Sequence, residues 1–297
     1  MPRSGEAEST LLAAMPAVFV LIWSTGFVVA RYGMPYAPPL GFLTLRYGLS
    51  VLAFALWIGW ARVAWPRGQA QWAHLAAVGV FMHAGYLGGV WMAIKGGIGA
   101  GTVALVVGLQ PVLTALWLSA ARGAHAVAAR QWIGLALGLF GLVLVVGNKV
   151  GLGEITPWNL SLSLFALLSI TVGTLYQKRF VGPCDVRTAN TVQLAAAGLV
   201  TAPLAWVEAG SWEGHLELFG ALAWSVLVLT LGGSSLLYLL IQRGAATRVV
   251  SLMYMMPPCT AVLAAVLFGE TLSMTVLAGF ALTAAGVWLV VQRRAAQ

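Results

Sequence analysis

Residues 11–291 contain ten apolar stretches, each about 20 residues long and followed by a short connection. A helix of ~20 residues is ~30 Å long, which matches the hydrocarbon core of a bilayer. Because 60% of the 297 residues are hydrophobic and only 8% are charged, the chain has too few charges to cover a water-soluble protein of this size. A membrane β-barrel is disfavoured, since its short alternating segments are missing from this sequence.

We therefore predict an all-α integral membrane protein with ten transmembrane helices, in which each helix satisfies its own backbone hydrogen bonds in lipid. The predicted spans are residues 11–30, 40–60, 74–94, 100–119, 128–147, 158–178, 188–207, 217–241, 247–268 and 274–291. Little sequence is left outside the bilayer, so the functional residues are expected between the helices.

The basic residues predict which side of the membrane each connection faces. With a cytoplasmic N-terminus, twelve Lys and Arg residues fall on the cytoplasmic side, and only Arg31, Lys95 and Lys149 fall outside. This bias follows the positive-inside rule and places both termini in the cytoplasm. The net charge of +8 is spread over short loops, without the basic cluster or soluble domain that nucleic-acid binding requires. We predict contact with membrane lipid and no nucleic-acid partner.

The second half of the chain repeats the first, because residues 100–146 align with residues 246–291. The alignment pairs Pro111 with Pro257, Gly134 with Gly279 and Gly141 with Gly286. Each repeat holds five spans, an odd number, so the second repeat enters the membrane from the opposite side. We predict two inverted five-helix repeats, residues 11–150 and 151–291, between short cytoplasmic tails at residues 1–10 and 292–297.

Several short motifs resemble those of the drug/metabolite transporter superfamily, specifically its ten-helix EamA-type branch. They are Trp23-Ser24-Thr25-Gly26-Phe27, Arg46, Pro111, Pro257 and Leu267-Phe268-Gly269-Glu270-Thr271. Within the branch the chain is similar to bacterial exporters of aromatic and other neutral amino acids. The resemblance implies a secondary transporter of the bacterial inner membrane that works by alternating access. The chain departs from the family in its first half, where Arg122-Gly123-Ala124 replaces the usual Gly-Glu pair.

Prolines at matching positions of the two repeats indicate where the substrate binds. Pro111 and Pro257 lie near the middle of the fourth and ninth spans. A proline within a helix frees a backbone carbonyl, which lipid cannot satisfy. Paired interruptions of this kind are typical of a transporter site, although each proline is also compatible with a simple packing kink.

Polar and aromatic residues at mid-span complete the candidate substrate-binding site, because such groups are costly in lipid unless they face the bundle interior. The alternative for each Ser or Thr is a bond to its own helix or a role in helix packing. The candidates are Trp23, Thr25, Phe27, His83, Tyr86, Gln110, Pro111, Thr114, Tyr176, Tyr238, Ser251 and Tyr254.

Arg46 is the clear formal charge well inside a span, and a charge at that depth indicates function. We predict that it attracts a substrate carboxylate from the external side or orders an outer gate. The competing interpretation is that its side chain snorkels to the outer headgroups or caps the carbonyls of a broken helix.

Acidic residues are missing from the centre of every predicted span, although proton- and sodium-coupled carriers commonly use them. His83 is the deep residue that can titrate near neutral pH. We therefore predict facilitated or weakly coupled transport, with His83 as the fallback proton site. Cys184 and Cys259 lack the spacing of a metal or redox site, so no cofactor is expected.

The leading hypothesis is a transporter that exports a small neutral metabolite, foremost an amino acid. Export of drugs or of other metabolites such as nucleosides, a passive channel and a subunit of a larger membrane complex stay open as alternatives. An intramembrane enzyme is disfavoured, because no nucleophile with a base assembles at membrane depth. The sequence leaves the oligomeric state open, and a monomer is compatible with it.

Overall fold

The computed structural model describes residues 3–121, 129–236 and 255–291, and these residues form helices and their connections. Two of the helical segments, η1 and η2, are π-helical. In chain order the elements are α1 (Arg3–Gly33), α2 (Pro39–Ala61), α3 (Gln69–Gly79), η1 (Val80–Gly85), α4 (Tyr86–Lys95), α5 (Ala100–Val107), α6 (Gln110–Ala121), α7 (Ala129–Gly151), α8 (Pro157–Phe180), α9 (Val186–Val207), α10 (Leu216–Ala223), η2 (Trp224–Gly232), α13 (Met256–Phe268) and α14 (Met274–Val291).

The predicted all-α membrane architecture agrees with these helices. Among the described residues, six segments are long and apolar enough to cross a membrane, and four shorter apolar segments accompany them. The six are 39–61, 69–95, 132–150, 157–180, 186–207 and 216–236, and the shorter ones are 17–33, 100–114, 256–268 and 274–289. The complete count of ten stays a prediction. Two boundaries differ from it: the first helix begins at Arg3, within the predicted tail, and the fourth span is broken in two.

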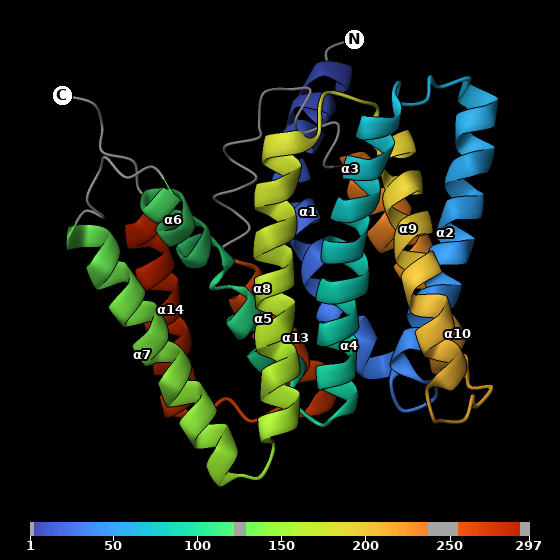
Figure 1. Cartoon of the computed structure of the whole chain (residues 1–297). Helices are drawn as coiled ribbons and strands as arrows, with labels where there is room; N and C mark the ends of the chain where they lie inside the picture. The colour runs from blue at the N-terminus through green and yellow to red at the C-terminus, as the bar shows by residue number, and fades with distance from the viewer. Residues whose placement is uncertain (1–2, 122–128, 237–254, 292–297) are drawn as a thin grey trace, which may run out of the picture.

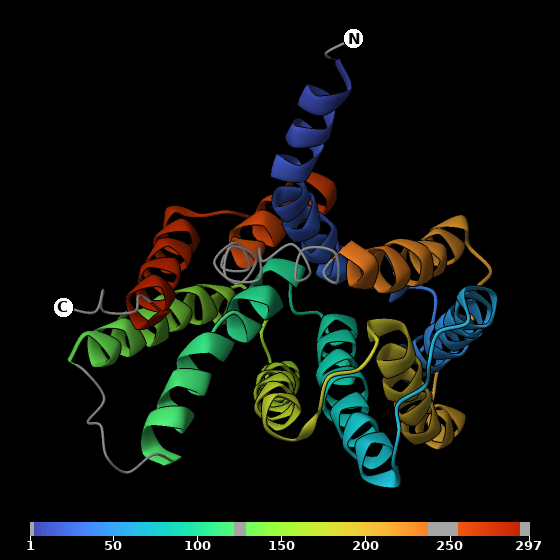
Figure 2. The same ribbon diagram turned by 90° about the horizontal axis from the view of Figure 1, so that it is seen from above.

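The helices cross the molecule in alternate directions (Figure 1). The start of α1, the end of α14 and the loops at residues 62–68 and 181–185 lie at one face, drawn at the top. Viewed from that face, α7 and α14 pack together at one end of the molecule, and α2, α9 and η2 lie at the other (Figure 2). With the predicted orientation, the top face is cytoplasmic.

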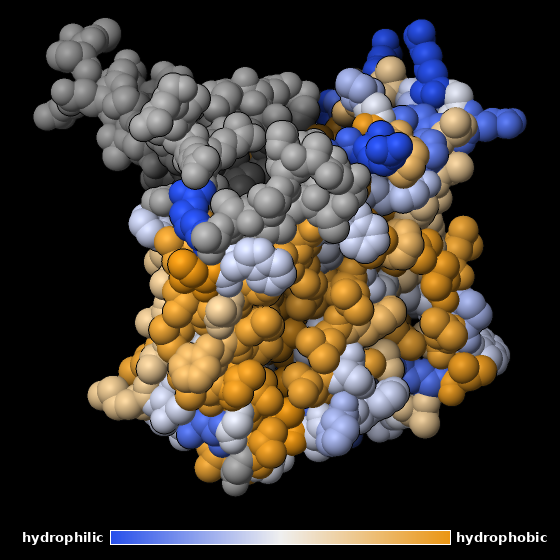
Figure 3. Space-filling model, turned by 60° about the vertical axis from the view of Figure 1, so that its left-hand side comes forward, coloured by the Kyte–Doolittle hydropathy of each residue, from blue (hydrophilic) through white to orange (hydrophobic). Residues whose placement is uncertain are grey.

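On the side drawn in Figure 3, apolar side chains form a belt between two more polar ends of the molecule. Large apolar side chains point outward from it, among them Leu199 at 78% exposure and Val266 at 77%. Contiguous apolar surface of this extent is typical of a lipid-facing protein. Trp60 and Trp206 are exposed near helix ends, where tryptophan anchors helices at the membrane interface.

Glycines allow α7 and α14 to pack backbone to backbone. A Cβ added to Gly286 would lie 2.6 Å from the backbone nitrogen of Gly138, and one added to Gly141 would lie 2.8 Å from that of Thr283. The contacts come in matching pairs, Gly141 with Gly279 and Gly286 with Gly134. Because the repeat alignment matches Gly134 with Gly279 and Gly141 with Gly286, the two contacts are related by the predicted pseudo-two-fold axis.

Carboxylates cap two helices that begin at the face opposite the loop of residues 62–68. Glu208 accepts hydrogen bonds from the backbone nitrogens of Leu40 and Gly41, at 2.9 and 3.0 Å, at the start of α2. Glu270 accepts one from the backbone nitrogen of Ala100 at 2.9 Å, at the start of α5. Acids at helix N-termini satisfy unpaired donors and complement the helix dipole. This role accounts for two of the acids on the predicted outer face.

Substitution of Glu270 tests the α5 cap. Gly269 has φ +66°, which turns the chain after α13 so that Glu270 meets α5. We expect Glu270→Ala to lower the free energy of unfolding by about 1–2 kcal/mol, because it removes an N-terminal acceptor and a favourable charge. Glu270→Gln, which keeps an acceptor oxygen, is expected to lose about half as much. Thermal unfolding of the detergent-solubilised protein measures both, and equal stability of wild type and Glu270→Ala would contradict the cap.

Candidate substrate-binding site

The predicted interruption of the fourth span is present and lies between two short helices. The last residue of α5 is Val107, and α6 begins at Gln110, directly before Pro111. The break lies inside the bundle, where Val106 and Leu109 are buried. A Cβ added to Gly108 would lie 2.8 Å from Cγ of Pro257, so the broken segment packs against the matching proline of the second repeat. The proline of the second repeat therefore lies against the break in the first.

Gln110 and its neighbours connect this interruption to α8. The side-chain nitrogen of Gln110 donates to Oγ1 of Thr174 at 2.9 Å, and Thr174 donates in turn to the carbonyl of Ile170. Thr114 lies one helical turn beyond Gln110 on α6 and is half-buried. The Gln110 amide thus has a partner within the bundle, as a polar group at this depth requires.

Arg46 lies inside the bundle on α2. Only 8% of the residue is exposed, and its Nη2 donates to Oγ1 of Thr230 on η2 at 3.2 Å. The snorkelling interpretation is therefore wrong for this conformation, because the side chain points to η2 rather than to the headgroups. Its Nε is buried without a hydrogen-bond partner among the described residues. The hydroxyls of Ser50 and Ser225 are also buried and have no hydrogen-bond partner there.

His83 and Tyr86 lie next to Arg46, on η1 and at the start of α4. The hydroxyl of Tyr47 donates to the carbonyl of His83 at 2.9 Å, and the two rings meet edge to face with 6.1 Å between centroids. The charge of Arg46 acts on Tyr47, His83 and Tyr86. A π-helical turn is often found at functional sites. These four residues form what we call the central polar group.

Other predicted residues are engaged elsewhere. Tyr176 lies near the predicted cytoplasmic end of α8, where its hydroxyl is 2.9 Å from Nδ1 of His74. Trp23 packs on Phe19 with 5.2 Å between ring centroids, in a cluster between α1 and α13.

Two further candidates on α1 take part in helix packing. Thr25 accepts a hydrogen bond from Nε1 of Trp224 at 2.9 Å, and Phe27 is buried in the main apolar cluster together with Tyr86. Tyr238, Ser251 and Tyr254 lie outside the described residues.

Sequence reasoning missed three members of this region: Tyr47, Gln193 and Thr230. Gln193 lies within hydrogen-bonding reach of the His83 side chain. The polarity of Gln193 at mid-span was a usable signal, because a buried amide in lipid needs a partner. Tyr47 and Thr230 gave a weaker signal, since a lone Tyr or Thr in a span is common.

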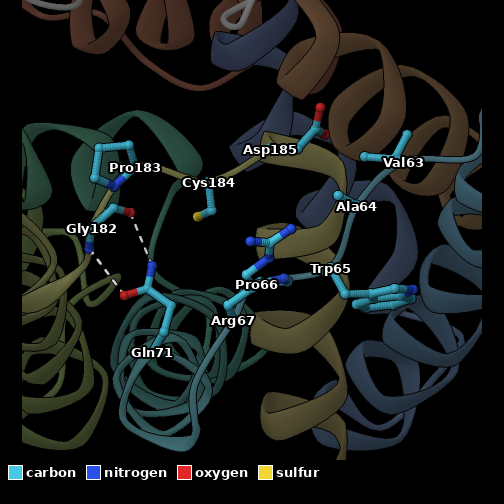
Figure 4. Close-up of a pocket in the computed structure, with 10 residues that line it drawn as sticks. All are labelled: Val63, Ala64, Trp65, Pro66, Arg67, Gln71, Gly182, Pro183, Cys184 and Asp185. Carbon is cyan, nitrogen blue, oxygen red and sulfur yellow. Dashed lines mark hydrogen bonds between the residues drawn. The ribbon is translucent and has the colours of Figure 1, made fainter.

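A separate hollow of about 510 Å³ opens at the predicted cytoplasmic face (Figure 4). Gln71 holds its two walls together, because its amide donates to the carbonyl of Gly182 at 2.9 Å and accepts from the same residue's nitrogen at 3.1 Å. Arg67, Cys184 and Asp185 also line it. None of the central polar group does, so this hollow is not the predicted site.

Asp185 provides a pH-dependent contribution at this face. Hydrogen bonds from Arg187 hold the pKa of its carboxyl below the usual value. A lowered folded-state pKa stabilises the fold above the unfolded pKa of about 4, and that contribution is lost as the pH falls through the folded pKa. We expect Asp185→Asn, which keeps a capping oxygen, to be less stable than wild type at pH 7 but to lose less stability between pH 6 and pH 3. Thermal unfolding across this range checks it, and parallel curves would contradict it.

Metal binding has no support in the part of the chain that the structure describes, where no cluster of three His, Cys, Asp or Glu residues is found. What the arrangement offers is a buried cation, Arg46, beside neutral polar and aromatic groups.

The chain is similar to known transporters over most of its length. The EamA-like transporter family matches the chain twice, at residues 10–147 and 157–292. The uncharacterized transporter YvbV of Bacillus subtilis is 26% identical over 98% of this chain and 95% of its own length. The uncharacterized inner membrane transporter YedA of Escherichia coli K12 is 28% identical over 89% of this chain and 85% of its own.

A third relative has a more specific name. The probable amino-acid metabolite efflux pump of Salmonella typhimurium is 24% identical over 91% of each chain. A protein of known crystal structure shares the fold, with a TM-score of 0.63 and 18% identity over 93% of this chain and 96% of its own. Two family matches that together cover nearly the whole sequence confirm the repeat and the predicted resemblance, and the chain belongs to the EamA-like transporter family.

Proposed function

We propose that this protein is a secondary transporter of the bacterial inner membrane that exports small neutral metabolites, foremost aromatic and other neutral amino acids. Alternating access between two inverted repeats moves the substrate past the broken fourth span. Membership of a transporter family supports transport, and the name of the Salmonella typhimurium relative supports amino acids as substrates.

The buried charge of Arg46 is the observation that supports a substrate with a carboxylate. The residue is 8% exposed, and none of the ion pairs among the described residues includes it. An uncompensated charge inside a membrane protein is costly, whereas a carboxylate from a ligand both neutralises it and fills the hydrogen-bonding capacity of Nε. An arginine fork matches a carboxylate in shape as well as in charge.

The neighbours of Arg46 favour a substrate that is neutral overall. Tyr47, His83 and Tyr86 offer oxygen and nitrogen acceptors for an ammonium group, and aromatic faces for an apolar side chain. All eight acidic residues of the sequence lie in loops, in tails or near helix ends, so a hydrophobic cation would find no carboxylate at mid-span. The drug alternative is therefore less well supported than the amino acid.

Counterflow in liposomes containing the purified protein tests the function. Vesicles preloaded with unlabelled phenylalanine are given labelled phenylalanine, threonine, glutamate or lysine. We expect saturable exchange of the neutral pair and little of the charged pair. Absence of exchange for all four would remove the amino-acid proposal, and non-saturating flux would indicate a channel.

The same vesicles test coupling. We expect exchange without an imposed pH gradient, because the spans carry no central acid. If uptake does depend on a gradient, His83→Ala should abolish that dependence. Full dependence retained in His83→Ala would exclude His83 as the proton site.

A further inference from the structure

Two polar contacts join the repeats across the bundle. In the first, Arg46 of α2 donates to Thr230 of η2. In the second, Gln193 of α9 lies within hydrogen-bonding reach of His83 on η1. Each contact pairs a residue of one repeat with a residue of the other, and α2 packs against η2 as α9 packs against η1.

The four residues occupy equivalent positions in the two repeats. Arg46 lies seven residues beyond Pro39, the start of α2, and Gln193 lies seven residues beyond Val186, the start of α9. His83 lies fourteen residues beyond Gln69, the start of α3, and Thr230 lies fourteen beyond Leu216, the start of α10. The pseudo-two-fold axis therefore exchanges the contact Arg46–Thr230 with the contact His83–Gln193.

Both contacts involve a π-helical segment. The η1 segment covers Val80–Gly85 and the η2 segment covers Trp224–Gly232, so the same departure from α-helix occurs in both repeats. In η2, Thr230 donates to the carbonyl of Ser225 five residues earlier, at 2.8 Å. In η1, the carbonyl of His83 accepts from Tyr47 instead. A wider turn leaves carbonyls to be satisfied by side chains, and in each segment one carbonyl accepts a hydrogen bond from a side-chain hydroxyl.

The contacts lie at opposite depths. Arg46 is ~10 Å along α2 from the predicted outer end, and Gln193 is ~10 Å along α9 from the predicted cytoplasmic end. The outer contact carries a formal charge and the inner one does not. In alternating access, residues exchanged by the axis meet the substrate at equivalent stages from opposite sides.

We infer that Gln193 and Thr230 are substrate-positioning residues that act on opposite sides of the membrane. Thr230 orients Arg46 for a carboxylate that arrives from outside. Gln193 orients His83 for a substrate that arrives from the cytoplasm. The inference rests on the proposed function. Because the cation belongs to the outer contact, phenylalanine half-saturates the transporter at a lower concentration from outside than from the cytoplasm.

Phenylalanine uptake into right-side-out and inside-out membrane vesicles tests the inference. Thr230→Val removes a hydroxyl at nearly constant volume, and we expect it to raise the external half-saturation concentration about three- to tenfold while the cytoplasmic one is unchanged. Gln193→Leu is expected to do the reverse, and Thr230→Ser to restore wild-type values.

The control is Thr201→Val, which removes a buried hydroxyl that accepts from Thr44 at 2.8 Å between α2 and α9 and belongs to neither contact. It should change neither half-saturation concentration. Equal effects on both faces, or none, from Thr230→Val and Gln193→Leu would overturn the inference while transport persists. Absence of saturable phenylalanine flux in the wild type would overturn the proposed function, and this inference with it.

Discussion

Replacing Arg46 with glutamine is expected to lower the rate of phenylalanine counterflow at subsaturating substrate by about ten- to a hundredfold. Hydrogen bonds to a charged group contribute about 1.5–3 kcal/mol, and glutamine keeps polarity while removing the charge. The loss should be larger than for a surface ion pair, because Arg46 is buried and solvent does not screen it. Initial rates in liposomes reconstituted with equal amounts of folded protein give the measurement.

Two comparisons separate a carboxylate receptor from a structural role for Arg46. Arg46→Lys keeps a positive charge but loses the planar fork, so an intermediate rate is expected. Flux of phenethylamine, a cation that lacks the carboxylate, should be small in the wild type and should not fall in Arg46→Gln. Arg67→Gln, an exposed substitution at the predicted cytoplasmic face, should leave counterflow unchanged. If Arg46→Gln slows phenylalanine and phenethylamine equally, Arg46 does not bind the carboxylate.

Hydropathy was sufficient to predict an all-helical membrane fold, because lipid allows few alternatives to a helix of bilayer length. The internal repeat was also readable, since glycine and proline are kept at matching positions in both halves. The matched glycines of α7 and α14 are packing positions in the structure, where Gly141 lies against Gly279.

The π-helical segments were not predictable. A π turn depends on how the whole helix packs against its neighbours, and no residue type in Val80–Gly85 predicts it. The hydrogen-bond partners of buried polar groups were equally unpredictable from the sequence. Arg46 and Thr230 are 184 residues apart, and only the tertiary fold brings them together.

Depth explains why some predicted site residues lie elsewhere. Tyr176 was chosen for its polarity within a span, yet it lies four residues before Phe180, the end of α8, and bonds His74 there. Position along the helix was a better guide than residue type in that case. Arg46 and His83, each well inside a span, do lie together.

Alanine at Gly286 or Gly141 is expected to lower the free energy of unfolding by about 2 kcal/mol or more. The added Cβ at Gly286 would lie 2.6 Å from the backbone nitrogen of Gly138, and backbone cannot move aside as a side-chain tip can. Overpacking of this kind usually costs about 1–3 kcal/mol. The helices must then separate, which also weakens the contact of the second glycine pair. Thermal unfolding in detergent should show a lower midpoint and less monodisperse protein.

Gly147 on α7 provides the matched control, because a Cβ added there meets nothing within 4 Å. Alanine at this position should be neutral or stabilising, since it favours the helix by about 1 kcal/mol over glycine. Gly147→Ala and Gly141→Ala lie on the same helix but should change the free energy of unfolding in opposite directions. The comparison therefore separates the effect of close helix approach from the effect of helix propensity. Since the pseudo-two-fold axis exchanges Gly141 and Gly286, their alanine variants should be destabilised to a similar extent. A stable Gly286→Ala variant would mean that α7 and α14 do not approach as closely in the membrane as they do here.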